Sequence, residues 1–150
     1  MFWYCDGSAL AKRYVRELGS QWFRQEVGKH SVIVAQVTIV EVRAAIALRM
    51  RTGSLSKFAG YKARQQYASH LSASLYLVLP LTGAIIDMAS RLVFSHPLRA
   101  YDAVQLATAL DHAKMGGVDR HHFCFLTADD RLERAANAEG LMTENPNRHS

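Results

Sequence analysis

The hydrophobic positions fall into two patterns that alternate along the chain. Short, almost wholly apolar runs have the length and composition of buried strands, and they lie at residues 2–5, 32–35, 75–79 and 123–126. Longer segments with apolar residues at helical spacing lie at 9–17, 20–27, 37–51, 55–71, 82–94, 99–116 and 130–138. Because helices rather than hairpin turns separate the strands, the pattern predicts an α/β fold with a mainly parallel sheet covered by helices on both faces.

The length of 150 residues suits one domain with a substantial core. We expect residues 1–142 to form this domain and the polar residues 143–150 to be a flexible tail. No apolar run approaches the ~20 residues that span a bilayer, and the first residues lack the basic region of a signal peptide. Cys5 and Cys124 lie in apolar runs and are expected to be reduced, which fits a cytoplasmic protein.

Four acidic residues lie inside apolar segments or at the edge of one, and they are Asp6, Glu41, Asp102 and Asp129. Burying an ionised carboxylate is costly unless the group is paired or bound to a metal. Asp6 and Asp129 each follow a predicted strand, and ligands of parallel sheets bind beyond the carboxyl ends of the strands. These two acids should therefore share one edge of the sheet, and the four together indicate a site for a divalent metal.

Each of these acids also has a structural interpretation. Asp6 could cap the helix that follows it, although Ser8 is a competing N-cap. Glu41 lies on the core-facing line of its helix, where the alternative is an ion pair with a distant base. Asp102 lies in the first turn of its helix, where the helix dipole favours an acid.

The fourth position is open between Asp129 and Asp130, which together begin the last helix. One of them could merely cap that helix, and we prefer Asp129 for the site because it is nearer the strand end. Oxygen ligands without a His or Cys cluster suit Mg²⁺ or Mn²⁺ rather than Zn²⁺. The net charge is +5, from 18 Lys and Arg against 13 Asp and Glu. If four acids line a pocket, the remaining surface is more basic and suits a polyanionic ligand, although charge alone also fits a solvated surface without a partner.

Four segments around these acids resemble the PIN-domain family, and most closely the VapC-type toxins of bacterial toxin–antitoxin pairs. The segments are YCDGSALAK at 4–12, TIVEV at 38–42, LRAYDAVQLA at 98–107 and FLTADDRL at 125–132. They occur in the family's order, and the similarity spans roughly residues 2–142. One departure is Gly7, where the family more often has Thr, and we expect this glycine to loosen the loop after the first strand.

The resemblance implies a PIN-like three-layer α/β/α sandwich with a short central sheet and the activity of a metal-dependent endoribonuclease. It implies that Mg²⁺ or Mn²⁺ is held by Asp6, Glu41, Asp102 and Asp129, with two polar side chains beside the pocket, Ser8 and Thr127. Basic residues near the acids are candidates for RNA contacts, and they are Lys12, Arg43, Arg99 and Arg131. Whether one or two metal ions act is left open.

The resemblance also implies a homodimer and a cognate antitoxin protein, with RNA as the substrate and no membrane partner. One alternative is a PIN-type nuclease that processes RNA outside a toxin pair. A second alternative is a basic RNA- or protein-binding module without catalytic activity, in which the acids are structural.

Overall fold

Five short parallel strands form the centre of the molecule, and the computed structural model describes residues 1–149. The sheet order is β3-β2-β1-β4-β5, with bounds β1 (Phe2–Cys5), β2 (Ser31–Ala35), β3 (Leu77–Leu79), β4 (Phe123–Leu126) and β5 (Met142–Glu144). All four pairings are parallel. The four strands predicted from apolar runs are confirmed, although β3 begins two residues later than expected.

The direction in which successive strands are added to the sheet reverses between β1 and β4. From β1 the chain moves outward to β2 and β3, and it then crosses back to β4 and β5 on the other side. The backbone N–H of Asp6 donates to the carbonyl of Leu126 (3.1 Å), so the pairing of β1 with β4 continues to the carboxyl ends of both strands. In open α/β sheets, ligands bind at such a switch point.

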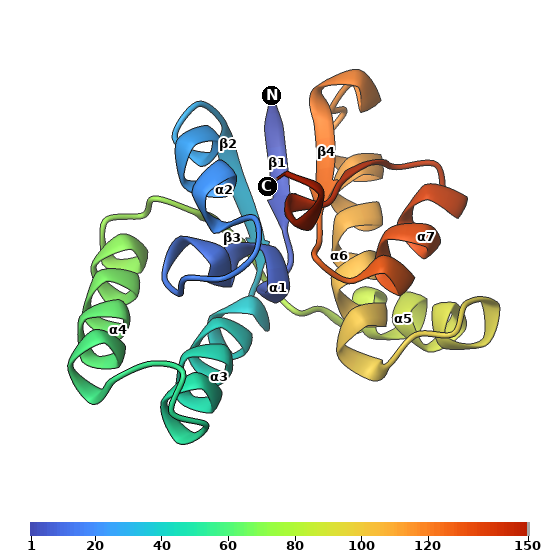
Figure 1. The fold of residues 1–150 in the computed structure, drawn as a ribbon. Helices are drawn as coiled ribbons and strands as arrows, with labels where there is room; N and C mark the ends of the chain where they lie inside the picture. The colour runs from blue at the N-terminus through green and yellow to red at the C-terminus, as the bar shows by residue number, and fades with distance from the viewer. Residues whose placement is uncertain (150) are drawn as a thin grey trace.

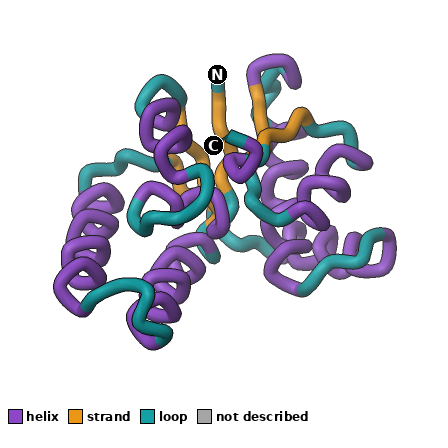
Figure 2. Tube along the Cα trace, viewed as in Figure 1, coloured by secondary structure: helices purple, strands orange, loops and turns teal. Residues whose placement is uncertain are grey.

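Helices cover both faces of the sheet, as Figures 1 and 2 show. One face carries α1 (Gly7–Leu10), α2 (Ser20–Val27), α3 (Thr38–Arg51) and α4 (Lys57–Ser72). The other face carries α5 (Gly83–Ser95), α6 (Ala100–Met115) and α7 (Asp130–Ala138). Alternate strand residues divide between two buried clusters, with Trp3 and Cys5 in the first and Tyr4 in the second. This alternation produces the predicted three-layer α/β/α sandwich.

The first helical segment is shorter than its periodicity predicts. The helix expected over 9–17 is α1 followed by a short 3-10 helix, η1 (Ala11–Arg13), after which the chain folds back on itself. The buried ammonium of Lys12 donates to the carbonyl of Leu18 (2.7 Å) and to Glu17 Oε1 (3.0 Å), and these bonds hold the fold-back in place. In this segment, hydrogen bonds to the buried Lys12 ammonium take the place of the backbone hydrogen bonds of a longer helix.

The C-terminal segment packs against the domain. The domain boundary expected at residue 142 falls inside β5, which pairs with β4. Asn145 is 1% exposed, and a 3-10 helix, η3 (Pro146–Arg148), follows it. This segment packs against the domain despite its polar composition, because its polar side chains form hydrogen bonds with buried partners.

The cysteines and the hydropathy of the helices agree with the expectations from sequence. Cys5 and Cys124 are buried and form no disulfide, and burial raises the pKa of the Cys124 thiol to about 12. Among the described residues, no helix combines the length and apolar character needed to cross a membrane.

Candidate active site

Asp6 lies at the carboxyl end of β1 and is tied to the loop after β4. Its side chain is buried, and its oxygens accept hydrogen bonds from the Ala9 N–H (2.8 Å), the Ser8 hydroxyl (2.8 and 2.9 Å) and the Thr127 hydroxyl (2.7 Å). Burial raises the pKa of Asp6 to about 6, although these three donors act against the rise. The carboxylate is therefore fixed in position but poorly compensated in charge.

Ser8 was expected to compete with Asp6 as the helix cap, and the structure gives these two residues a different arrangement. Asp6 is the N-cap of α1, and Ser8 donates to it. The Ser8 hydroxyl also accepts from the Ala128 N–H (2.8 Å), while Thr127 accepts from the Asp129 N–H (3.1 Å). The two hydroxyls beside the pocket thus join the loops after β1 and β4, and Asp6 both caps a helix and faces the other acids.

Glu41 approaches Asp6 from α3 and is held by two N–H donors. Its Oε2 accepts from the Gly7 N–H (3.1 Å) and from the Gln105 side-chain amide (2.6 Å). Burial first, and then the charge of Asp6, raise the pKa of Glu41 to about 7. Among the described residues, no hydrogen bond or ion pair involves its second oxygen, Oε1, so that oxygen is left for a ligand.

Gln105, which the sequence analysis did not single out, holds Glu41 in place. It is 1% exposed on α6, its Oε1 accepts from the Tyr4 hydroxyl (2.7 Å), and its Nε2 donates to Thr38 Oγ1 (2.8 Å) as well as to Glu41. A buried amide of this kind is costly unless its groups are bonded. The available signal was a lone amide in an apolar helical stripe, three residues after Asp102.

Gly7 lies against the Glu41 side chain. A Cβ at this position would lie 2.5 Å from Cβ and 3.0 Å from Cδ of Glu41, where carbon atoms normally lie roughly 3.5–4.0 Å apart. We expected Gly7 to loosen the loop. The structure instead shows that Gly7 allows a close contact, because a residue without a side chain leaves room for Glu41.

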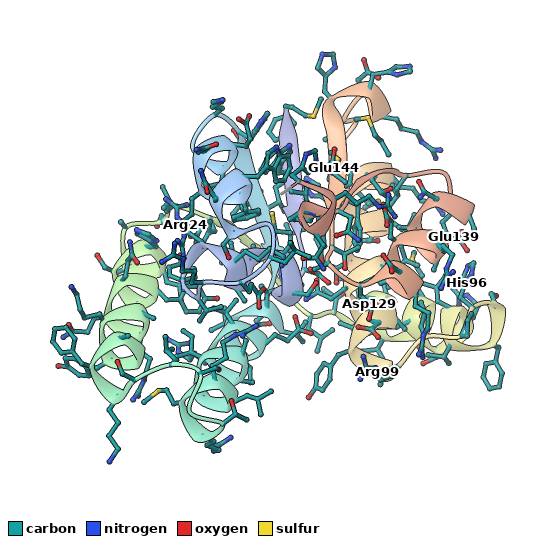
Figure 3. All side chains as sticks on the ribbon, viewed as in Figure 1. Arg24, His96, Arg99, Asp129, Glu139 and Glu144 are labelled. Carbon is teal, nitrogen blue, oxygen red and sulfur yellow. The ribbon has the colours of Figure 1, made fainter. Side chains whose placement is uncertain are left out.

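Asp102 and Asp129 complete the group and share one guanidinium. Arg99 Nε lies 3.5 Å from Asp102 Oδ2, and Arg99 Nη2 lies 3.7 Å from Asp129 Oδ2. Figure 3 shows Arg99 and Asp129 near each other at the start of α6 and α7. Burial and the charge of Asp129 raise the pKa of Asp102, and Arg99 opposes the rise.

The structure places Asp129 beside Arg99 and Asp102, while Asp130 turns away from them. Asp129 caps α7 through Oδ1, which accepts from the Arg131 and Leu132 N–H groups (2.8 and 3.1 Å), and its Oδ2 faces Arg99. Asp130 is exposed and accepts from Asn145 Nδ2 (3.1 Å) on the side of the C-terminal segment.

The basic residues near the acids in sequence are used in different ways. Lys12 is buried and donates to three acceptors, including Asn147 Oδ1 (2.6 Å), and burial lowers its pKa to about 8. Arg43 lies over the Tyr67 ring, 5.4 Å from its centroid. Arg131 is exposed, and Arg99 is 79% exposed beside two of the acids. Lys12 is therefore structural, while Arg99 faces the pocket.

The four predicted acids form one electrostatic group. Asp102 raises the pKa of both Asp6 and Glu41, Asp6 raises that of Glu41, and Asp129 raises that of Asp102. Such mutual repulsion among hard oxygen ligands is the environment that a divalent cation relieves.

The oxygen donors of the four acids suit Mg²⁺ or Mn²⁺, but they do not form a closed cage around an ion. Among residues 1–149, no three His, Cys, Asp or Glu side chains lie together as a ready-made metal site. Mg²⁺ usually keeps several waters and binds through one or two carboxylates, so it does not need such a cage. Ser8 has one proton and donates to one Asp6 oxygen at a time, which leaves Asp6 a lone pair for a cation.

Comparison with known proteins identifies one matching family and several solved structures with a similar fold. The profile of the family described as PIN domain matches residues 2–138. No curated protein matches the sequence. The FitAcB crystal structure from Neisseria gonorrhoeae has a TM-score of 0.65 at 17% identity and covers 100% of both chains.

Two further solved structures share the fold at low sequence identity. A toxin–antitoxin complex from Klebsiella pneumoniae has a TM-score of 0.61 at 15% identity, covering 95% of this chain and 96% of that one. VapBC2 from Rickettsia felis, bound to a DNA fragment from its promoter, has a TM-score of 0.58 at 11% identity, covering 97% and 98%.

Proposed function

Because the chain belongs to the PIN-domain family, we propose that it is a metal-dependent endoribonuclease and the toxin of a toxin–antitoxin pair. PIN domains are in general nucleases that use divalent metal ions, and solved proteins with this fold include toxin–antitoxin complexes. The observation that carries the proposal is the group of four mutually repelling carboxylates at the switch point of the sheet.

Asp6, Glu41, Asp102 and Asp129 would hold Mg²⁺ or Mn²⁺ between them. When bound, such an ion neutralises a phosphate oxygen and lowers the pKa of a coordinated water. Glu41 would face the ion through Oε1, because Gly7 and Gln105 occupy Oε2. Arg99 has donors beside two of the acids and is suited to hold the RNA phosphate.

The same proposal includes the partners. A cognate antitoxin, a homodimer and a location in the cytoplasm are the expected setting of such a toxin, with RNA as the substrate. An active nuclease for which no antitoxin can be found would instead support a role in RNA processing.

The test is cleavage of single-stranded and structured RNA with Mg²⁺ or Mn²⁺. We expect cleavage by the wild type, complete loss in EDTA, and a loss of at least about a hundredfold for Asp102→Asn, because Asp102 belongs to the acid group. Asp111→Asn, on the same helix but outside the four acids, should keep full activity. Cleavage that persists in both EDTA and Asp102→Asn would exclude the metal mechanism, whereas RNA binding without any cleavage would favour a binding module.

A further inference from the structure

Two adjoining hollows lie on the surface of the early helices, and the first has Ser8, a neighbour of Asp6, in its wall. The first, of about 400 Å³, is lined in part by Ser8 and Ala128 at one end and by Leu18 and Arg49 further along. Ser8 is the residue that donates to Asp6, and Ala128 donates to Ser8. This hollow, here named the inner hollow, therefore has a residue that contacts Asp6 in its wall, although none of the four acids lines it.

The second hollow, here named the outer hollow, has a volume of about 1040 Å³ and lies over α2 and the C-terminal segment. It shares Glu17 and Leu18 with the inner hollow, so the two adjoin at these residues. Three arginines line it, and they are Arg16, Arg24 and Arg148.

The arginines of the outer hollow differ in how far they are already engaged. Arg148 makes two short bonds to the buried carboxylate of Glu133 (2.6 and 2.9 Å). Within the described residues, Arg16 and Arg24 take part in no ion pair, and both are exposed. Arg24, labelled on α2 in Figure 3, uses only Nε, which donates to the Arg13 carbonyl (3.1 Å), so its two terminal nitrogens are available. Arg16 and Arg24 thus carry uncompensated charge into the hollow.

A second basic surface offers a comparison. Arg43, Arg51 and Arg64 line a separate hollow of about 360 Å³ on α3 and α4. Its lining includes neither Ser8 nor Ala128 and shares no residue with the inner or outer hollow. Positive charge alone therefore does not single out the outer hollow, but its position next to the inner hollow, whose Ser8 contacts Asp6, does.

We propose that the inner and outer hollows form a track for a single RNA strand that leaves the acid group, with Arg16 and Arg24 gripping its phosphates. The proposal rests on the proposed function, because it takes the strand to be the substrate of the acids. A flexible single strand can follow two adjoining hollows with its phosphates on basic side chains. Arg49, which pairs with Glu17 where the hollows meet, stands beside the same path.

Binding of a fluorescent single-stranded RNA of about 12 nucleotides tests the track, measured in EDTA so that no cleavage occurs. Arg16→Ser with Arg24→Ser should raise Kd several-fold and lower the slope of log Kd against log salt by about 1.4, or about 0.7 for each lost phosphate contact. The matched double variant Arg51→Ser with Arg64→Ser should change Kd and slope much less. Equal effects of the two double variants, or a larger effect of the second, would overturn the track.

Cleavage adds a second arm. With Mg²⁺ or Mn²⁺, the Arg16→Ser, Arg24→Ser variant should lose kcat/KM on the long RNA and keep it on a trinucleotide that fills only the acid group. If the wild type binds RNA through these arginines but never cleaves it, the nuclease proposal fails and the track stands. If the variant keeps RNA binding but loses binding of a poly-glutamate peptide, the surface serves an acidic protein partner and the RNA track is wrong.

Discussion

Two uncharged neighbours determine where the Glu41 carboxylate lies. Gly7 gives it a backbone donor at close range, and Gln105 gives it an amide that is itself fixed by Tyr4 and Thr38. Neighbours that orient a metal-binding side chain commonly matter about 10–100-fold for metal affinity or activity. Glu41 therefore depends on residues that carry no chemistry of their own.

Gly7→Ala tests this dependence, because the new Cβ would overlap Glu41. We expect Mn²⁺ binding, measured by calorimetry, and RNA cleavage both to weaken by about 10–100-fold. Gly83→Ala is the matched control, since Gly83 is also the first residue of a capped helix and a Cβ there meets nothing within 4 Å. A Gly7→Ala protein that binds Mn²⁺ like the control would remove the positioning role.

The four acids were predictable because an acid in an apolar segment is an energetic exception that the sequence displays. Gln105 and Gly7 were not, since an amide and a glycine become informative only when their contacts are known. Lys12 was expected to touch RNA, yet it is buried among three acceptors, two of which lie on a loop and a C-terminal segment that sequence spacing does not bring near it.

At the scale of elements, the C-terminal segment supports the helix that begins at Asp129. The Glu133 side chain on α7 is 4% exposed and accepts from Arg148 and Asn145. Asn145 also donates to Asp130, which draws the side chain of Asp130 toward the segment and away from the acid group. The tail thus contributes to which of the two neighbouring aspartates faces the site.

Arg148→Ala should destabilise the protein by roughly 1–3 kcal/mol, because it leaves a buried carboxylate without its charged donor. Urea unfolding monitored by circular dichroism measures the change. Arg134→Ala, an exposed arginine on α7 beside Glu133 and outside every described ion pair, should stay within about 0.5 kcal/mol of wild type. Restored stability in the double variant Arg148→Ala, Glu133→Leu would support the cause, and equal losses for both arginines would contradict it.

Periodicity predicted most elements because most of them bury one apolar face. The strand Phe2–Cys5 and the helices Ser20–Val27 and Asp130–Ala138 have the predicted bounds. The strand β5 was missed because Met142–Glu144 lies at the sheet edge, with one residue exposed and two half-buried, so it lacks an apolar run. Short edge strands are specified by their pairing partner rather than by their own hydrophobicity.

At the scale of the whole molecule, the acids that would bind a metal ion also lower the free energy of unfolding when they ionise. Burial and mutual repulsion raise the pKa of Asp6 to about 6 and that of Glu41 to about 7. An acid whose pKa is raised by folding binds its proton more tightly in the folded state. The folded protein then holds more protons than the unfolded chain between about pH 4 and pH 7, so these groups make the free energy of unfolding fall as pH rises through that window.

Without metal, we therefore expect the acid group to make the wild type less stable at pH 8 than at pH 5, with Asp6 alone contributing about 1.4 kcal/mol. Burial lowers the pKa of His30 and His70, which gives an opposite slope, so the measure is the difference between wild type and Asp6→Asn. Urea unfolding in EDTA should show Asp6→Asn gaining on wild type as pH rises.

Adding Mn²⁺ should reverse this loss, because a cation that binds only the folded acids stabilises them by mass action. The rise in Tm should be largest at pH 8, where the carboxylates are ionised, small at pH 5, and much reduced in Asp6→Asn. A rise in Tm that is equal at both pH values and unaffected by Asp6→Asn would mean that Mn²⁺ binds elsewhere. Coupling between pH, metal and stability would instead show that the acids which weaken the empty fold are the ones that bind the ion.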